Sequence, residues 1–199
     1  MNILFYSLIF LFLHSYLIRF ISIPKFYSIS NYNLNQRVKM KDLEQEVRKV
    51  IRKNNWLVLS TVNEKNQPHS SVIMYQSDGN VLYFMTGLNT LKSKDMQKNN
   101  KVAITIPFRK GFFHKLIPAP PAELHFKAIA ESVPTDNEEA AKMLAKFLKY
   151  SENAGVDDDS IWYKLTPSNL ISTFGVGVSL LNMRNPEKAS NLVRLNPLE

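Results

Sequence analysis

The chain has 199 residues, is 45% hydrophobic and carries a net charge of +8, which is enough for one domain with a substantial core. It contains no cysteine, which excludes disulfides, thiolate metal sites and cysteine nucleophiles. No basic run is long enough to indicate nucleic-acid binding, so the positive charge favours an anionic cofactor or substrate instead.

Residues 3–23 are almost entirely apolar and are close in length to a transmembrane helix. They are either a membrane anchor or part of an upstream extension that a shorter native product lacks, and both interpretations stay open. As an anchor, with Arg19 and Lys25 on the C-terminal side, they would leave the following domain in the cytoplasm. We therefore expect a hydrophobic leader over residues 1–39 and a folded, cytoplasmic domain over residues 40–199.

The domain is predicted to open with a helix capped by Asp42, because Gln45 stands three residues later in capping-box position. Strands rich in β-branched and aromatic residues follow at 56–62, 69–75 and 81–86. Asn and Pro residues supply the first turn, and the sequence Asp-Gly supplies a tight second one. Three antiparallel strands are therefore expected in succession.

A short helix is predicted next, with Asn89 or Thr90 as its cap and Leu91 and Met96 as its apolar positions. A hydroxyl and Lys92 at the start of a helix that follows a strand form a candidate phosphate site, because the exposed N–H groups and the helix dipole favour an anion. A solvated amphipathic helix is the open alternative. A fourth strand is expected at 102–106.

The second half of the chain begins with a long loop, residues 107–121, which mixes cations and aromatics. It is expected to cover a bound ring or an anionic substrate, or else to contact a partner subunit or remain disordered. A strand at 123–131 and a helix with a capping box from Thr135 follow.

Two further strands are predicted at 162–167 and 170–181, and the polar tail after Arg184 is expected to be peripheral. The four histidines are scattered without metal-ligand spacing, so no metal site is predicted. Among them, His69 stands out because it begins a predicted strand.

These residues together resemble the pyridoxamine 5′-phosphate oxidase-like family of FMN-binding split barrels. The likeness covers residues 56–106 and rests on a proline turn, an Asp-Gly hairpin, a strand ending in an aromatic and Thr, and a hydroxyl-x-Lys helix start. The residues that carry it are Pro68, Asp78, Gly79, Phe84, Met85, Thr86, Thr90, Leu91, Lys92, Met96 and Asn99. Two positions depart from the pattern: Asn100 stands where Pro is usual, and Ser71 stands where the vitamin-synthesising oxidases carry a phosphate-binding Arg. The second departure indicates a relative of that oxidase.

The resemblance implies a mainly β fold with flanking helices, a split β-barrel, whose first helix plugs one end. It also implies an FMN-dependent oxidoreductase acting on a small molecule, built as a homodimer with flavin sites across the subunit interface. The implied cofactor-binding residues are Ser71, Val72, Ile73, Met74, Met85, Thr86, Thr90 and Lys92. No side chain is required as a general acid or base, so no catalytic residue is assigned. A deazaflavin-dependent reductase of the same fold and a non-catalytic flavin- or haem-binding protein are the open alternatives.

Overall fold

The computed structural model describes residues 39–109, 121–154 and 159–196. By its internal contacts the chain divides into two units, Met1–Asp42 and Leu43–Glu199, and the second contains all the strands. The apolar segment 3–23 and most of the predicted 107–121 loop lie outside the described residues. Within the part of the chain that is described, no helix is both long and apolar enough to cross a bilayer.

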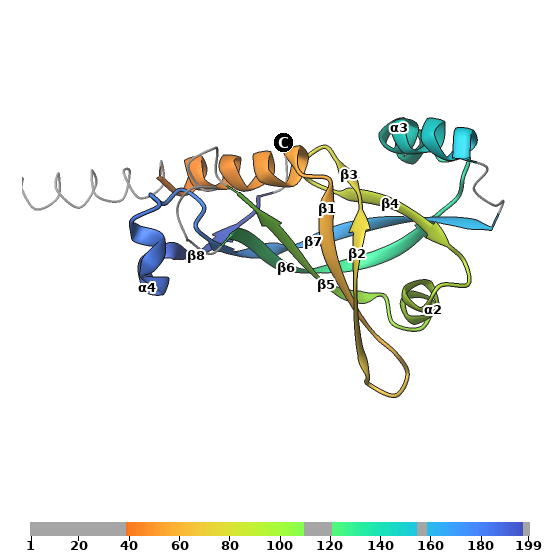
Figure 1. Cartoon of the computed structure of the whole chain (residues 1–199), viewed down its shortest axis with the longest axis horizontal. Helices are drawn as coiled ribbons and strands as arrows, with labels where there is room; N and C mark the ends of the chain where they lie inside the picture. Colours follow the sequence, from red (N-terminus) through yellow and green to blue (C-terminus); the bar gives the residue numbers. More distant parts are fainter. Residues whose placement is uncertain (1–38, 110–120, 155–158, 197–199) are drawn as a thin grey trace, which may run out of the picture. The chain divides into compact units, whose positions relative to one another are not determined.

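The described residues form eight strands in one antiparallel sheet, in the order β2-β1-β5-β6-β7-β4-β3 with β8 beside β7 (Figure 1). They are β1 (Trp56–Val62), β2 (Pro68–Met74), β3 (Gln76–Ser77), β4 (Leu82–Gly87), β5 (Lys101–Phe108), β6 (Ala122–Val133), β7 (Ser160–Phe174) and β8 (Ser190–Arg194). A single residue, Tyr75, separates β2 from β3, so the chain itself joins the two ends of this order. The two ends of the order are thus joined through the chain and not by strand pairing, as in a split barrel, and the predicted mainly β fold with flanking helices is confirmed.

Tyr75 fixes the corner at which the barrel closes. Its side chain is fully buried, its hydroxyl donates to the carbonyl of Ile51 at 2.8 Å, and its backbone N–H donates to the carbonyl of Asn55 at 2.9 Å. Burial raises the pKa of the Tyr75 phenol, so the group stays neutral and remains a donor. The corner is thus tied to the end of the helix over residues 39–53 and to the start of β1.

β7 pairs with β6 along most of its length, while its other edge pairs first with β4 and then with β8. The prediction of separate strands at 162–167 and 170–181 is wrong, because Pro167 pairs with Ala128 and a register shift opposite Lys127 accommodates residues 168–170 without ending the strand. The strand ends at Phe174, since Gly175 has a φ of 77° that an extended strand does not allow.

The tail after Arg184 is part of the fold, so its predicted peripheral position is wrong. It forms helix α4 (Pro186–Ala189) and strand β8, and its residues Ala189 and Val193 are fully buried. Only Val193 of the five β8 residues is buried. So short a strand shows no recognisable hydrophobic pattern in the sequence.

Helices close the barrel and cover part of its outer surface. The 39–53 helix contributes Val47 and Ile51 to the main core, and Figure 1 shows its residues 43–53 on one side of the strands with α2 (Leu91–Lys98) on the other. Helix α3 (Glu138–Ala154) packs against β4 and β7 through a second apolar cluster around Tyr83 and Trp162. The sheet is therefore enclosed on these sides, whereas Trp56 and Val72 on the outer face of β1 and β2 are exposed.

Two predicted helix starts are displaced. Residues 39–41 are already helical, so Asp42 is not the first residue of its helix; lysine and methionine favour the extra turn. Helix α3 is capped by Asn137 rather than Thr135, because the Asn137 side chain accepts a hydrogen bond from the N–H of Ala140 at 2.9 Å. Both elements exist as predicted, and only their boundaries move.

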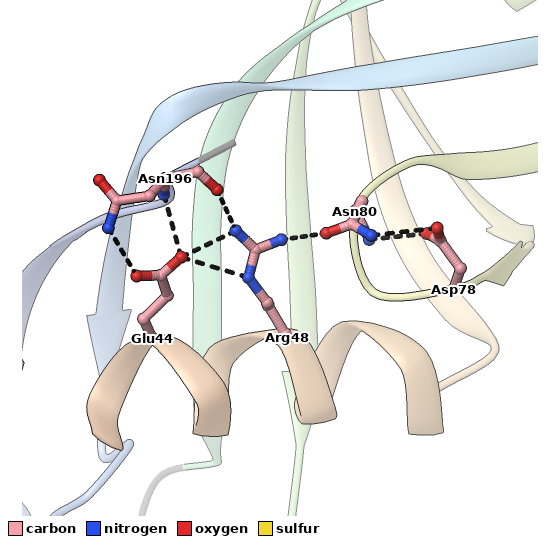
Figure 2. Close-up of polar contacts among 5 residues, drawn as sticks. All are labelled: Glu44, Arg48, Asp78, Asn80 and Asn196. Atoms are coloured by element: carbon pink, nitrogen blue, oxygen red, sulfur yellow. Dashed lines mark hydrogen bonds and ion pairs between the residues drawn. The ribbon is translucent and has the colours of Figure 1, made fainter. Parts of the chain in front are cut away.

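A polar cluster links three distant parts of the chain (Figure 2). Arg48 donates to the carboxylate of Glu44, to the side chain of Asn80 in the β3–β4 turn, and to the carbonyl of Asn196 near the C-terminus. Glu44 in turn accepts from the N–H and the side-chain amide of Asn196, each at 2.9 Å. Asp78 completes the arrangement by accepting from Asn80. We call these five residues the Arg48 cluster.

Candidate functional site

The candidate phosphate site lies where β4 gives way to helix α2. Of the two predicted caps, Thr90 is the one used: its hydroxyl oxygen accepts from the N–H of Ser93 at 3.4 Å. The same hydroxyl donates to the carbonyl of Gly87 at 2.9 Å, and the Thr90 N–H donates to that carbonyl at 3.2 Å. The turn between strand and helix is therefore fixed by hydrogen bonds within four residues.

Several hydrogen-bond donors lie near the turn between β4 and α2. The hydroxyl of Thr86, at the end of β4, lies 3.4 Å from that of Thr90. The backbone N–H groups of Leu91 and Lys92 belong to the first turn of α2 and have no acceptor among the described residues. Together with the positive charge that Lys92 carries on the same turn, they form a set of groups suited to a phosphate. The Thr90 proton is already donated to Gly87, so Thr90 acts first as the cap.

The two candidate lysines differ in their surroundings. Lys92 is half-buried and Lys94 is exposed. Between them Ser93 is fully buried, with its hydroxyl 3.1 Å from the hydroxyl of Tyr163 on β7. This contact holds one side of α2 against the barrel, while Lys94 lies on the exposed side of the helix.

The predicted β2 residues point to opposite sides of the sheet. Ser71 and Ile73 lie opposite Leu59 and Leu57 of β1, on the inner face. Val72 and Met74 point outward, with 66% and 39% of their surfaces exposed. A strand alternates its side chains, so the four cannot contact one ligand from one side.

Met85 and Thr86 are divided in the same way. Met85 packs against the apolar cluster beneath α3, whereas Thr86 turns toward Thr90. Of the eight predicted residues, the structure therefore brings Thr86, Thr90 and Lys92 together at the start of α2.

One part of this region was not identified from the sequence. The carboxylate of Asp95 on α2 accepts from the hydroxyl of Thr61 at 2.7 Å and lies 3.3 Å from Nδ1 of His69. Asp95 and Thr61 are buried, while the His69 side chain is 42% exposed. The sequence did contain one indication of Asp95: it stands three residues after Lys92, and residues with this spacing lie on the same side of a helix.

The described histidines bind side chains rather than forming a metal site. His69 contacts Asp95, and Nδ1 of His125 lies 3.0 Å from the hydroxyl of Thr105. Across residues 39–109, 121–154 and 159–196, no group of three or more His, Asp or Glu side chains is arranged to hold a metal ion. His14 and His114 lie outside the described residues.

Comparisons with solved structures show the same fold in several proteins. HutZ, a heme storage protein from Vibrio cholerae, shares 20% identity over 65% of this chain and 92% of its own, with a TM-score of 0.51. General Stress Protein 26 from Bacillus anthracis shares 21% identity over 77% of this chain and 98% of its own, with a TM-score of 0.52. A FAD-binding protein from Mesorhizobium loti shares 15% identity over 65% and 91%, with a TM-score of 0.51. At these identities the likeness concerns the fold alone.

No curated protein sequence matches the chain. The family model for pyridoxamine 5′-phosphate oxidase does match, over residues 43–173, which is more than half of the chain and includes β1 through nearly all of β7. The resemblance recognised between residues 56 and 106 is thereby confirmed and extended. The chain belongs to the pyridoxamine 5′-phosphate oxidase family of split β-barrels.

Proposed function

We propose that the chain binds FMN with its phosphate at the start of α2 and acts as a flavin-dependent oxidoreductase on a small molecule. The observation that carries the proposal is the grouping of Thr86, Thr90 and Lys92 near the first N–H groups of α2, which have no acceptor among the described residues. A single terminal phosphate is the anion that such a compact set of donors fits best. We also propose that the protein acts in the cytoplasm, because a chain without cysteine is compatible with a reducing compartment.

The residues present fit the phosphate end of a flavin. Thr86 offers a hydroxyl, the first turn of α2 offers N–H groups, and Lys92 offers a full positive charge. Ser71, which stands where the vitamin-synthesising oxidases carry an arginine, offers a neutral hydroxyl only. Lys92 therefore supplies the positive charge that pairs with the phosphate, and its removal should weaken FMN binding strongly.

The flavin, when bound, supplies the redox chemistry. The protein's part would be to position it: Thr86, Thr90 and Lys92 would hold the phosphate, and Ser71–Met74 would line the ring, as the resemblance to the family implies. No general acid or base is required from these side chains. Thr90 contributes chiefly as the N-cap that begins α2 at the correct residue, and its replacement by alanine should cost about 1 kcal/mol of stability.

Purified protein should be yellow and should release FMN on denaturation. The visible spectrum combined with mass spectrometry of the released ligand provides the test. FAD or a deazaflavin in place of FMN, a haem absorption band, or no ligand after reconstitution with FMN would each contradict the proposal. Bound FMN without turnover of NAD(P)H or reduced flavin across a substrate panel would favour the non-catalytic alternative.

We further propose that a second copy of the chain covers the outer face of the β1–β2 hairpin. There Trp56 lies opposite Met74 and Val58 opposite Val72, so that apolar side chains from both strands adjoin. Trp56 is 50% exposed and Val72 is 66% exposed, which is unusual for adjacent large apolar residues on a sheet. Homodimers of the family place flavin sites across the subunit interface, and the outward side chains of Val72 and Met74 would then face both ring and partner.

Val72→Asp should convert the dimer into a monomer, because it places a charge in the centre of this apolar face. Light scattering after gel filtration should give twice the 22.9 kDa chain mass for the unmodified protein and the chain mass for the variant. Leu181→Asp is the matched control, since Leu181 is 76% exposed but lies outside the strands. A monomeric parent protein, or a variant that remains dimeric, would contradict the proposed interface.

A further inference from the structure

Helix α2 needs external contacts to hold its direction. It has eight residues, and helices this short are unstable alone. Met96 is its one buried apolar residue; the other buried positions are the polar Ser93 and Asp95. Polar contacts with the barrel must therefore decide how the helix, and with it Lys92, is oriented.

Asp95 makes two of these contacts. One oxygen of its carboxylate, Oδ2, accepts from Thr61 at 2.7 Å and lies 3.3 Å from Nδ1 of His69. Thr61 is on β1 and His69 is on β2, directly opposite each other in the strand register. The Thr61 side chain is buried, with 1% of its surface exposed. A single buried carboxylate thus joins α2 to both strands of the β1–β2 hairpin.

Lys92 depends on the same orientation. Residues three apart on a helix lie on one side of it, so Lys92 and Asp95 project in related directions. Lys92 has no ion pair with any other described residue, which leaves its charge free for a ligand. Any change in the rotation of α2 at Asp95 would therefore displace the ammonium group of Lys92.

We propose that Asp95 is a positioning residue for the cofactor phosphate. By accepting hydrogen bonds from the β1–β2 hairpin, it fixes the rotation of α2 and directs Lys92 at the phosphate. The inference rests on the proposed function, because it requires a flavin phosphate at the start of α2. It assigns a role to Asp95 that depends on Lys92 and involves no contact with the cofactor.

The test is a double-mutant cycle on FMN affinity. Asp95→Ala should raise the Kd for FMN about tenfold in the otherwise unchanged protein, and by less than about twofold when Lys92 is already alanine. Thermal unfolding of the FMN-free proteins provides the measure of folding. Glu64→Gln is the matched control: its carboxylate also contacts α2, at 3.3 Å from Lys98, but it is 70% exposed, so the Kd should change by less than about twofold.

The outcomes separate the two proposals. If the unmodified protein does not bind FMN, the proposed function fails and the inference with it. If FMN binds but Asp95→Ala weakens binding by the same factor with and without Lys92, Asp95 has a general structural role and only the inference fails. Should Asp95→Ala not fold, Thr61→Val removes the donor with little change in shape, and the same coupling at about threefold is expected. The absence of coupling in that variant would overturn the inference.

Discussion

Replacing Lys92 by alanine should weaken FMN binding about ten- to a hundred-fold. A hydrogen bond between charged groups contributes about 1.5–3 kcal/mol, and each factor of ten in affinity corresponds to about 1.4 kcal/mol. No arginine on β2 shares the phosphate charge, because that position is Ser71. Titration of the FMN-free protein, followed by quenching of flavin fluorescence, gives the affinity directly.

Lys94→Ala is the matched control for this measurement. It removes the same charge from the same helix, but Lys94 is exposed to solvent, where its field at the site is screened. Its effect should be at most about threefold. A greater loss at Lys94 than at Lys92 would show that the phosphate lies elsewhere on α2.

The elements around α2 could be predicted because their causes are local. The strand predicted at 56–62 is β1, and the Asp-Gly turn has Gly79 at a φ of 105° as that turn type requires. The group of Thr86, Thr90 and Lys92 spans seven consecutive positions. A sequence motif can identify such a group because the turn and the helix cap between its members are formed by local hydrogen bonds.

What could not be predicted depends on residues far apart in the sequence. Thr61 and Asp95 are 34 positions apart, and although the spacing from Lys92 places Asp95 on the same side of α2, it does not indicate which strand the carboxylate contacts. β8 has a single buried residue, and it is recognisable as a strand only beside the second half of β7. Local sequence patterns identify single helices and strands, whereas the contacts between these elements depend on the register of the whole sheet.

The Arg48 cluster is such a long-range contact, and its loss should have the greatest effect on stability. Arg48→Met should lower the free energy of unfolding by about 2–3 kcal/mol, because it leaves the carboxylate of Glu44 without its charged partner and Asn80 without a donor. The two side chains of this ion pair are only 17% and 13% exposed, so water cannot fully replace the lost contacts. Urea denaturation of the two proteins measures the difference.

Lys49→Met, on the same helix, is the control. Lys49 pairs with Glu46 at 3.2 Å, but both side chains are about half exposed, so the change should be within about 0.5 kcal/mol. Equal effects at the two positions would contradict the role given to the Arg48 cluster.

The same cluster predicts a dependence on pH. Burial alone would raise the pKa of Glu44, but the hydrogen bonds from Arg48 and Asn196 outweigh it and hold the pKa below the ordinary value of 4.5. Stabilisation by the ionised group is therefore complete above about pH 4.5, the unfolded-state pKa, and is lost as the pH falls through the lower folded-state pKa. Glu44→Gln should be less stable than the parent protein at pH 7, and the difference should shrink in acid as the parent carboxylate is protonated. A difference that stays constant down to the folded-state pKa would mean that the charge of Glu44 does not contribute.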